Sequence, residues 1–249
     1  VMLAYLIVVS SSLLAFGRLA DIHGKRRIYL MGIVIFTLGS LACSLSRTIG
    51  LLIASRALQA LGAAMLFALS PALLVAAFPS SERGRALGMQ ATLTYLGLAL
   101  GPPLGGFLTQ HFGWPTIFSI NVPIGLAMWG LALVVLHPDR NGAGQPFDPI
   151  GAGAMAIGLA ATLFALSKGG EMGWRHPLII TAALTGLLAL VALLICEQRC
   201  RYPALDLKLF RNRRFAASMA AAWLSYVCAA SLSFLMPFRF LLGAGWEPA

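Results

Sequence analysis

Charge is scarce in this sequence, and acidic residues are the scarcest. Of its 249 residues 10% are charged, whereas about 25% is usual in soluble domains, and the mean hydropathy is +0.85. The eight Asp and Glu residues all lie outside the long apolar runs, at positions 21, 82, 139, 148, 171, 197, 206 and 247. This composition argues against a soluble domain and predicts an all-α integral membrane protein.

Cysteine and histidine are also few, and their positions argue against metal and enzyme chemistry. Of the four cysteines, Cys196 and Cys200 lie one helical turn apart, but no histidine accompanies them, so a metal site there is the weaker interpretation. The four histidines are scattered in or beside loops. The sequence contains no nucleophile–base pair and no phosphate-binding loop. We therefore expect no cofactor, no metal and no enzyme activity.

Basic residues give the chain a net charge of +10, but their distribution is not that of a nucleic-acid-binding surface. Of 18 Lys and Arg residues, 13 lie in four polar segments that would share one side of a membrane. Short loops rich in Lys and Arg stay in the cytoplasm. The charge therefore predicts topology, with the lipid bilayer as the surroundings and no nucleic-acid partner.

Eight runs are long enough, or nearly so, to cross a hydrocarbon core that needs about 20 apolar residues. Alternation of these spans from the first basic loop puts residues 78–85, 137–149 and 197–214 in the cytoplasm and both chain ends outside. The predicted spans are approximately 1–17, 28–46, 49–77, 86–108, 114–136, 150–167, 177–196 and 215–238.

The first polar segment, residues 17–27, has the sequence GRLADIHGKRR. Its cations begin the second span, where a helix N-terminus disfavours positive charge, so the positive-inside bias explains them better. The pattern resembles the loop between the second and third helices of the major facilitator superfamily. The resemblance implies a conformational gate with a tight hairpin at two glycines and an acid that docks against a helix end or an arginine. The implied gating residues are Gly17, Asp21, Gly24, Lys25 and Arg26.

The third span contains a basic residue, Arg56, about two turns inside its outer boundary. A charge at the bilayer centre costs roughly 2.5–3.5 kcal/mol unless it is paired or hydrated, so Arg56 is a functional candidate. A snorkelling arginine near the interface is the alternative. The pattern R-x-x-Q-x-x-G-x-A resembles the fourth-helix motif of the superfamily, with Ala60 where glycine is usual. That resemblance implies a role in proton coupling for Arg56, and we assign Gln59 to the same site.

The fourth span contains the sequence GLALGPPLGG, residues 97–106. Glycines at every fourth position form a groove that another backbone can approach, and the two prolines should bend the helix. Close packing alone would explain the glycines. The whole pattern, however, resembles the antiporter motif in the fifth helix of drug–proton antiporters. The implied motif residues are Gly97, Gly101, Pro102, Gly105 and Gly106.

Helix count points to one branch of the superfamily. Two further spans follow the short linker 137–149, as in the fourteen-span drug–proton antiporters, and residues 203–212 resemble the linker into their ninth helix. We therefore predict three parts. Residues 1–136 would be helices two to six of the N-terminal bundle, residues 137–214 the two extra central helices with a basic linker, and residues 215–249 the start of the C-terminal bundle. The chain would be an internal fragment lacking the first helix.

The resemblance implies a proton-coupled multidrug exporter that works by alternating access in a cell membrane, with a bacterial inner membrane as the expected location. Its partners would be a small amphipathic compound and protons. A carrier of another solute on the same fold, or a membrane scaffold without transport, is the alternative. Proton-driven exchange needs a titratable carboxylate at membrane depth. No predicted span contains one, so we expect it in the helix that would precede residue 1. The sequence does not identify the substrate-binding residues or the oligomeric state.

Overall fold

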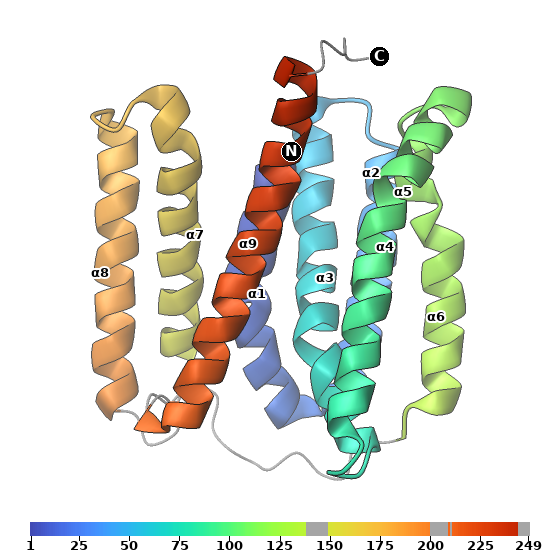
Figure 1. The fold of residues 1–249 in the computed structure, drawn as a ribbon, viewed down its shortest axis with the longest axis horizontal. Helices are drawn as coiled ribbons and strands as arrows, with labels where there is room; N and C mark the ends of the chain where they lie inside the picture. Colours follow the sequence, from blue (N-terminus) through green and yellow to red (C-terminus); the bar gives the residue numbers. More distant parts are fainter. Residues whose placement is uncertain (138–148, 200–208, 210, 244–249) are drawn as a thin grey trace. The chain divides into compact units, whose positions relative to one another are not determined.

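A computed structural model describes the chain except for residues 138–148, 200–208, 210 and 244–249. The described part is helical, without β-strands, and divides into two units, Val1–Ala204 and Leu205–Ala249. Figure 1 shows the ribbon. The first unit contains α1 (Met2–His23), α2 (Lys25–Ser44), α3 (Ile49–Ala77), α4 (Arg83–Phe112), α5 (Thr116–Ser119), α6 (Asn121–Val135), α7 (Pro149–Met172) and α8 (Pro177–Arg199), and the second unit contains α9 (Arg213–Gly243).

The apolar runs form helices, as the sequence predicts. Seven helical segments of the described chain are long and apolar enough to cross a membrane, counting α5 and α6 together as the segment Thr116–Val135. They correspond to the first seven predicted spans. The eighth predicted span lies within α9, which is 31 residues long and is not among those seven. These findings confirm an all-α membrane architecture.

The first polar segment differs from its predicted form. We expected residues 17–27 to form a turn, but α1 continues through Gly17 to His23, and α2 begins at Lys25. The break is the single residue Gly24, whose φ of 96° is a conformation that L side chains rarely adopt. Polarity marked where the chain leaves the apolar core, but a helix continues past that point until a residue permits the reversal. Of the two glycines assigned to the hairpin, only Gly24 lies at the reversal, and Gly17 lies within α1.

The best-packed part of the first unit is the contact between α2 and α3. Its buried residues are mostly small, with Ala60 and Ala64 fully buried on α3. A Cβ added to Gly39 of α2 would lie 2.6 Å from the backbone N of Gln59, and one added to Gly62 would collide with the backbone of α2 at Phe36. Small residues at these positions let the two backbones touch. Helix α1 packs on α3, and α5 and α6 pack on α2.

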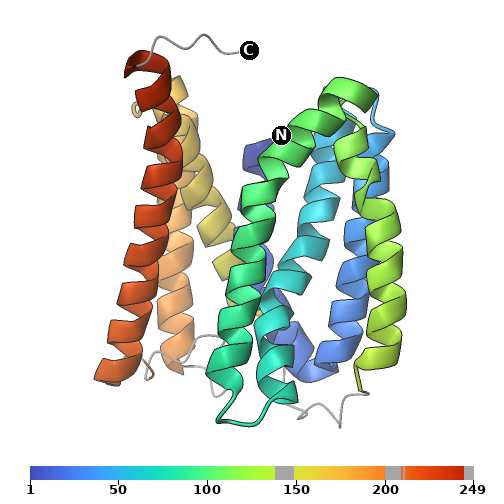
Figure 2. The same ribbon diagram turned by 45° about the vertical axis from the view of Figure 1, so that its right-hand side comes forward.

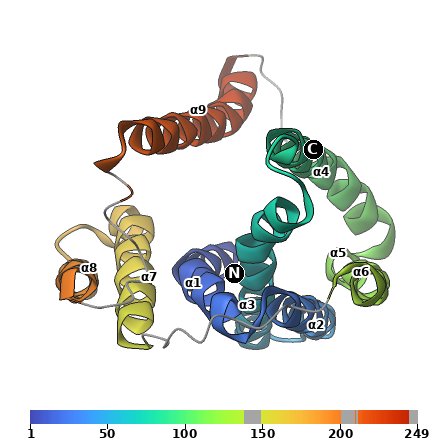
Figure 3. The ribbon, with the colours of Figure 1, turned by 90° about the horizontal axis from the view of Figure 1, so that it is seen from below.

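Helices α7 and α8 form an antiparallel pair that also depends on small residues. Gly158 of α7 lies against Leu190, and Gly186 of α8 lies against Thr162. Helix α7 in turn packs on α1. Figure 3, viewed along the helices, shows this pair beside α1, on the side away from α6.

Helix α4 is the least packed of the long helices in the first unit. It contacts α3 and α5, and no residue along its 30-residue length is buried. Figure 2 shows it changing direction toward its C-terminal end. That half of the helix contains Pro102 and Pro103, which remove two amide donors. The bend agrees with the expected effect of the prolines.

Candidate functional site

Arg56 begins a chain of side-chain hydrogen bonds that runs from α3 to α2. Its Nη1 donates to Oε1 of Gln59 at 2.9 Å, and Nε2 of Gln59 donates to Oγ of Ser40 at 2.7 Å. The Ser40 hydroxyl donates to the carbonyl of Phe36 at 2.8 Å. Gln59 is 2% exposed and Ser40 is fully buried. The spacing of three residues places Arg56 and Gln59 on one face of the helix, so their pairing agrees with their assignment to one site.

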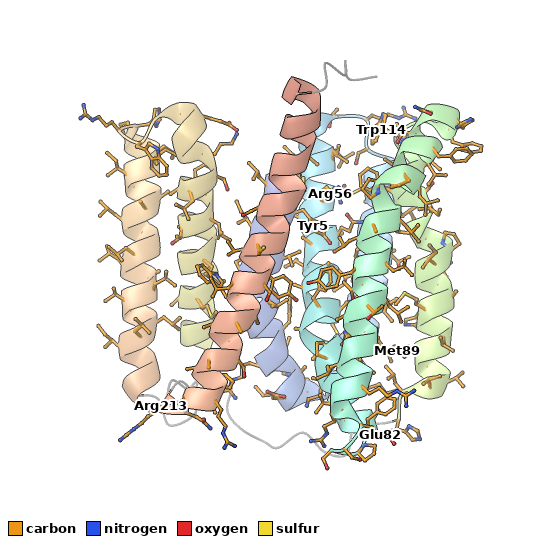
Figure 4. All side chains as sticks on the ribbon, viewed as in Figure 1. Tyr5, Arg56, Glu82, Met89, Trp114 and Arg213 are labelled. Atoms are coloured by element: carbon orange, nitrogen blue, oxygen red, sulfur yellow. The ribbon has the colours of Figure 1, made fainter. Side chains whose placement is uncertain are left out.

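Two aromatic rings lie against the Arg56 guanidinium. Its Cζ is 5.2 Å from the ring centroid of Tyr5 on α1 and 4.6 Å from that of Phe118 on α5. Figure 4 shows Arg56 and Tyr5 in the same half of the bundle as Trp114, while Glu82 lies at the opposite end. The arginine therefore joins side chains from α1, α2, α3 and α5.

The electrostatics of the Arg56 site are incomplete within the described part of the chain. The Nε atom of Arg56 is buried and has no hydrogen-bond partner among the described residues. Ion pairs among the described residues join Asp21 to Lys25 and Lys168 to Glu171, so neither pair neutralises Arg56. Neutral partners were expected from the sequence; the aromatic ones were missed. Tyr5 and Phe118 are 51 or more residues from Arg56 along the chain, and no periodic pattern connects them.

The acidic residue of the gating segment, Asp21, forms an ion pair with a lysine of the same segment. Oδ1 of Asp21 lies 4.0 Å from Nζ of Lys25, one helical turn away across the break at Gly24. The two side chains are 52% and 38% exposed, respectively, and such surface pairs contribute little to stability. We expected Asp21 to dock against a helix end or an arginine, and the described contact is instead this local pair.

Arg26 makes a long-range hydrogen bond from this segment. Its Nη2 donates to the backbone carbonyl of Leu133 at 2.9 Å, in the last turn of α6. The C-terminus of a helix carries partial negative charge and unpaired carbonyls. Helix electrostatics therefore does favour Arg26, through a neighbouring helix rather than its own. This contact joins positions 107 residues apart, and the sequence pattern of α2 alone does not predict it.

The glycines of the antiporter motif on α4 have room for a side chain in the described part of the chain. A Cβ added to Gly97, Gly101, Gly105 or Gly106 would meet no atom within 4 Å. The glycine stripe predicted a close backbone partner, and that partner is not found among the described residues. The functional assignment of the motif remains a prediction.

A cavity of about 490 Å³ lies at the end of the bundle that the charge pattern places in the cytoplasm. Tyr29, Ser70 and Gln90 contribute its polar groups, and apolar side chains of α3 and α6 form most of the wall. Its size is within the range of ligand pockets. Neither Arg56 nor any gating or antiporter-motif residue lines this cavity, and no sequence pattern predicted it.

Comparison with known proteins identifies the family. The sequence model of the Major Facilitator Superfamily matches residues 1–149. The chain is 36% identical over 239 residues to the riboflavin transporter RibZ of Clostridioides difficile (strain 630), covering 96% of this chain and 51% of RibZ. It is 34% identical over 221 residues to the multidrug resistance protein Stp of Mycobacterium tuberculosis (strain ATCC 25618 / H37Rv), covering 88% of this chain and 41% of Stp.

A third relative is the putative multidrug resistance protein MdtD of Escherichia coli O1:K1 / APEC, 33% identical over 248 residues, which are 100% of this chain and 52% of MdtD. The chain thus spans about half the length of the curated relatives it matches. These relatives are named as transporters or resistance proteins rather than enzymes. The family match covers more than half of the sequence, and together with the apolar helices it shows that this chain belongs to the Major Facilitator Superfamily as a multi-pass membrane protein.

Proposed function

We propose that the protein containing this chain exports small amphipathic compounds in exchange for protons, by alternating access, from a bacterial inner membrane. The observation that carries the proposal is Arg56, a cation at membrane depth with one buried donor, Nε, unused within the described residues. Two relatives named as multidrug resistance proteins support export of drug-like compounds. The fourteen-span arrangement belongs to the same proposal.

The unused donor of Arg56 indicates the kind of group it meets in the whole protein. A buried donor left without an acceptor costs about 1–3 kcal/mol, and a membrane-buried charge needs an opposite charge or water. Gln59 and the two rings are neutral, so they orient the guanidinium without neutralising it. We infer that a carboxylate outside the described residues accepts from Nε. Protonation of that carboxylate removes its negative charge and weakens the pair, which links proton binding to the contact between helices.

The other assigned residues would serve the conformational change. The segment around Gly24 joins α1 to α2 and reaches α6 through Arg26, so it ties together one end of three helices. Gly97, Gly101, Pro102, Gly105 and Gly106 of α4 would form the surface on which the other half of the transporter slides. A proton-driven exchanger needs such a surface because its two halves must change their relative orientation.

The test is efflux of a fluorescent cationic dye by the complete protein in vesicles with an imposed pH gradient. Arg56→Ala should abolish gradient-driven efflux while dye still equilibrates without a gradient. Arg56→Lys should be partly active, because an ammonium lacks the planar fork that holds two acceptors. Gradient-driven efflux by Arg56→Ala at the wild-type rate would overturn the proposal.

A second prediction concerns the gate. Asp21→Asn should reduce efflux strongly while membrane insertion and thermal stability change little, because the Asp21–Lys25 pair is exposed. Efflux and the melting temperature are measured on the same preparation. Undiminished efflux by Asp21→Asn would show that Asp21 has no role in gating.

The relative named as a riboflavin transporter supports a second candidate, a carrier of another solute on the same fold. The same vesicles loaded with riboflavin distinguish the two. Riboflavin movement without dye efflux would favour the second candidate.

A further inference from the structure

We infer that Tyr5 and Phe118 are positioning residues that hold the Arg56 guanidinium in one plane, so that its unused Nε faces the proton-carrying group. The inference rests on the proposed function and goes beyond it, because it assigns a role to two residues on other helices. The rings approach from α1 and α5 at 5.2 and 4.6 Å from Cζ. Phe118 is 8% exposed, so its ring is held in place by packing.

The geometry leaves the guanidinium little freedom. An arginine cation is attracted to the faces of aromatic rings, and its planar group can stack on them. Gln59 holds the edge that carries Nη1, at 2.9 Å. Rings against the guanidinium and an acceptor at one edge together define its orientation and direct the buried Nε at a group outside the described chain.

The ring of Phe118 packs against a second aromatic ring, that of Trp114. Trp114 meets its ring edge-on, with centroids 6.2 Å apart and planes at 80°. The two residues lie in the short connection between α4 and α6, whereas Tyr5 lies on α1. The rings that contact Arg56 therefore come from two separate elements, α1 and α5, of the same predicted bundle.

The alternative is that the rings only fill space. Leucine also fills space but has no π face, so paired substitutions separate the two explanations. Phe118→Leu and Tyr5→Leu remove the face, whereas Phe118→Trp and Tyr5→Phe keep it. Phe67→Leu is the matched control, because Phe67 also lies on a bundle helix but is 57% exposed.

The experiment measures dye efflux and proton uptake together, in vesicles that contain the complete protein, across a series of internal pH values. In each leucine variant the gradient-driven rate should fall about tenfold, the effect of losing one desolvated cation–π contact, and its pH profile should shift. The aromatic variants and Phe67→Leu should stay within about twofold of wild type, because they keep the contact. Equal losses in the leucine and aromatic variants, or unchanged coupling in the leucine variants, would overturn the inference.

A measurement without transport separates this inference from the proposed function. A double-mutant cycle on the melting temperature of the purified protein combines Phe118→Leu with Arg56→Gln. The inference requires Phe118→Leu to lower the melting temperature more when Arg56 is present than when it is absent. Additive effects would show that the ring and the cation do not interact, whatever the wild-type protein transports. If the wild-type protein shows no proton-driven efflux but the double-mutant cycle is non-additive, the proposed function is wrong and the inference about the rings still holds.

Discussion

Helix α4 and the α2–α3 pair both contain regularly placed small residues, but they use them differently. In the α2–α3 pair, Gly39 and Gly62 lie so close to the opposite backbone that a Cβ would collide with it. On α4, Gly97 and Gly101 face open space among the described residues. The glycine pattern of α4 is the easier one to recognise in the sequence. The glycines of α2 and α3, however, are the ones that contact a neighbouring backbone.

The difference separates two uses of glycine in a membrane helix. A glycine that is already in contact contributes to the stability of this bundle, because no larger residue fits there. A glycine without a neighbour contributes nothing to this bundle and even weakens its own helix. We therefore expect the glycines of α4 to make a contact elsewhere in the whole protein or in another conformational state, and this expectation can be tested. Substitutions in the α2–α3 contact should therefore reduce folding and stability, whereas substitutions on α4 should reduce transport.

The largest effect should come from Gly39→Leu. The new side chain would start 2.6 Å from the backbone of Gln59, so α2 and α3 must separate, and the Gln59–Ser40 hydrogen bond would be lost with them. Overpacking of this kind costs about 1–3 kcal/mol and sometimes more, and the yield of folded protein should collapse. The measurement is monodisperse yield in detergent together with the melting temperature. Gly130→Leu on α6 is the control, since a Cβ there meets nothing within 4 Å.

A Gly39→Leu variant that purified and melted like wild type would show that α2 and α3 are not in backbone contact. It would also remove the contrast with α4. Gly62→Leu repeats the test from the other helix, because its Cβ would meet α2 at Phe36.

The sequence was sufficient for the features that depend on local pattern. Apolar runs predicted the helices, and the three-residue spacing predicted that Gln59 lies beside Arg56, because both follow from helix geometry. Contacts between distant segments were not predictable in this way. Phe118 lies 62 positions after Arg56, and Arg26 meets Leu133 across 107 positions.

Helix ends were predicted poorly for a related reason. Residues 18–23 include the polar side chains Arg18, Asp21 and His23, and we predicted a turn from them. They are nevertheless helical, because a helix can continue beyond the apolar core and ends only where the backbone reverses, at Gly24. Polarity indicates the depth of a residue in the membrane, whereas backbone conformation determines where the helix stops.

Gly101→Leu should have the second-largest effect, confined to transport. A Cβ added at this position meets no atom within 4 Å, so we expect the leucine variant to fold normally. If α4 faces the other half of the transporter, the branched side chain would block that approach, and dye efflux by the complete protein should be lost. Efflux and the melting temperature are measured on one preparation. Normal efflux would show that this face of α4 makes no functional contact, and a loss of folding would show that it is already packed.

Gln59→Leu should have an intermediate effect that both assays detect. It removes the acceptor of Arg56 Nη1 and the donor to Ser40, both within the closed α2–α3 contact. Leaving buried polar groups unpaired costs about 1–3 kcal/mol, so the melting temperature should fall by several degrees and gradient-driven efflux should fall as well. Gln59→Glu keeps an acceptor for Arg56, so we expect efflux to recover more than in Gln59→Leu. A leucine variant with wild-type stability would mean that the hydrogen-bond chain does not hold α2 to α3.

The smallest effect should come from Gly97→Ala, compared with Gly32→Ala on α2. Gly97 is in the interior of α4 with no atom within 4 Å of an added Cβ, so alanine should stabilise the helix by roughly 0.5–1 kcal/mol through its lower conformational entropy in the unfolded chain. An alanine at Gly32 gains the same entropy but would place its Cβ 2.8 Å from the Cβ of Met65, and this crowding should outweigh the gain. The same chemical change should thus raise the melting temperature by a few degrees on α4 and lower it on α2. Equal changes in melting temperature for the two variants would contradict the proposed difference between the packed glycines of α2 and the unpacked glycines of α4. Efflux by Gly97→Ala then measures how close the missing neighbour comes, because a methyl group is tolerated wherever the approaching backbone leaves about 3.5–4.0 Å.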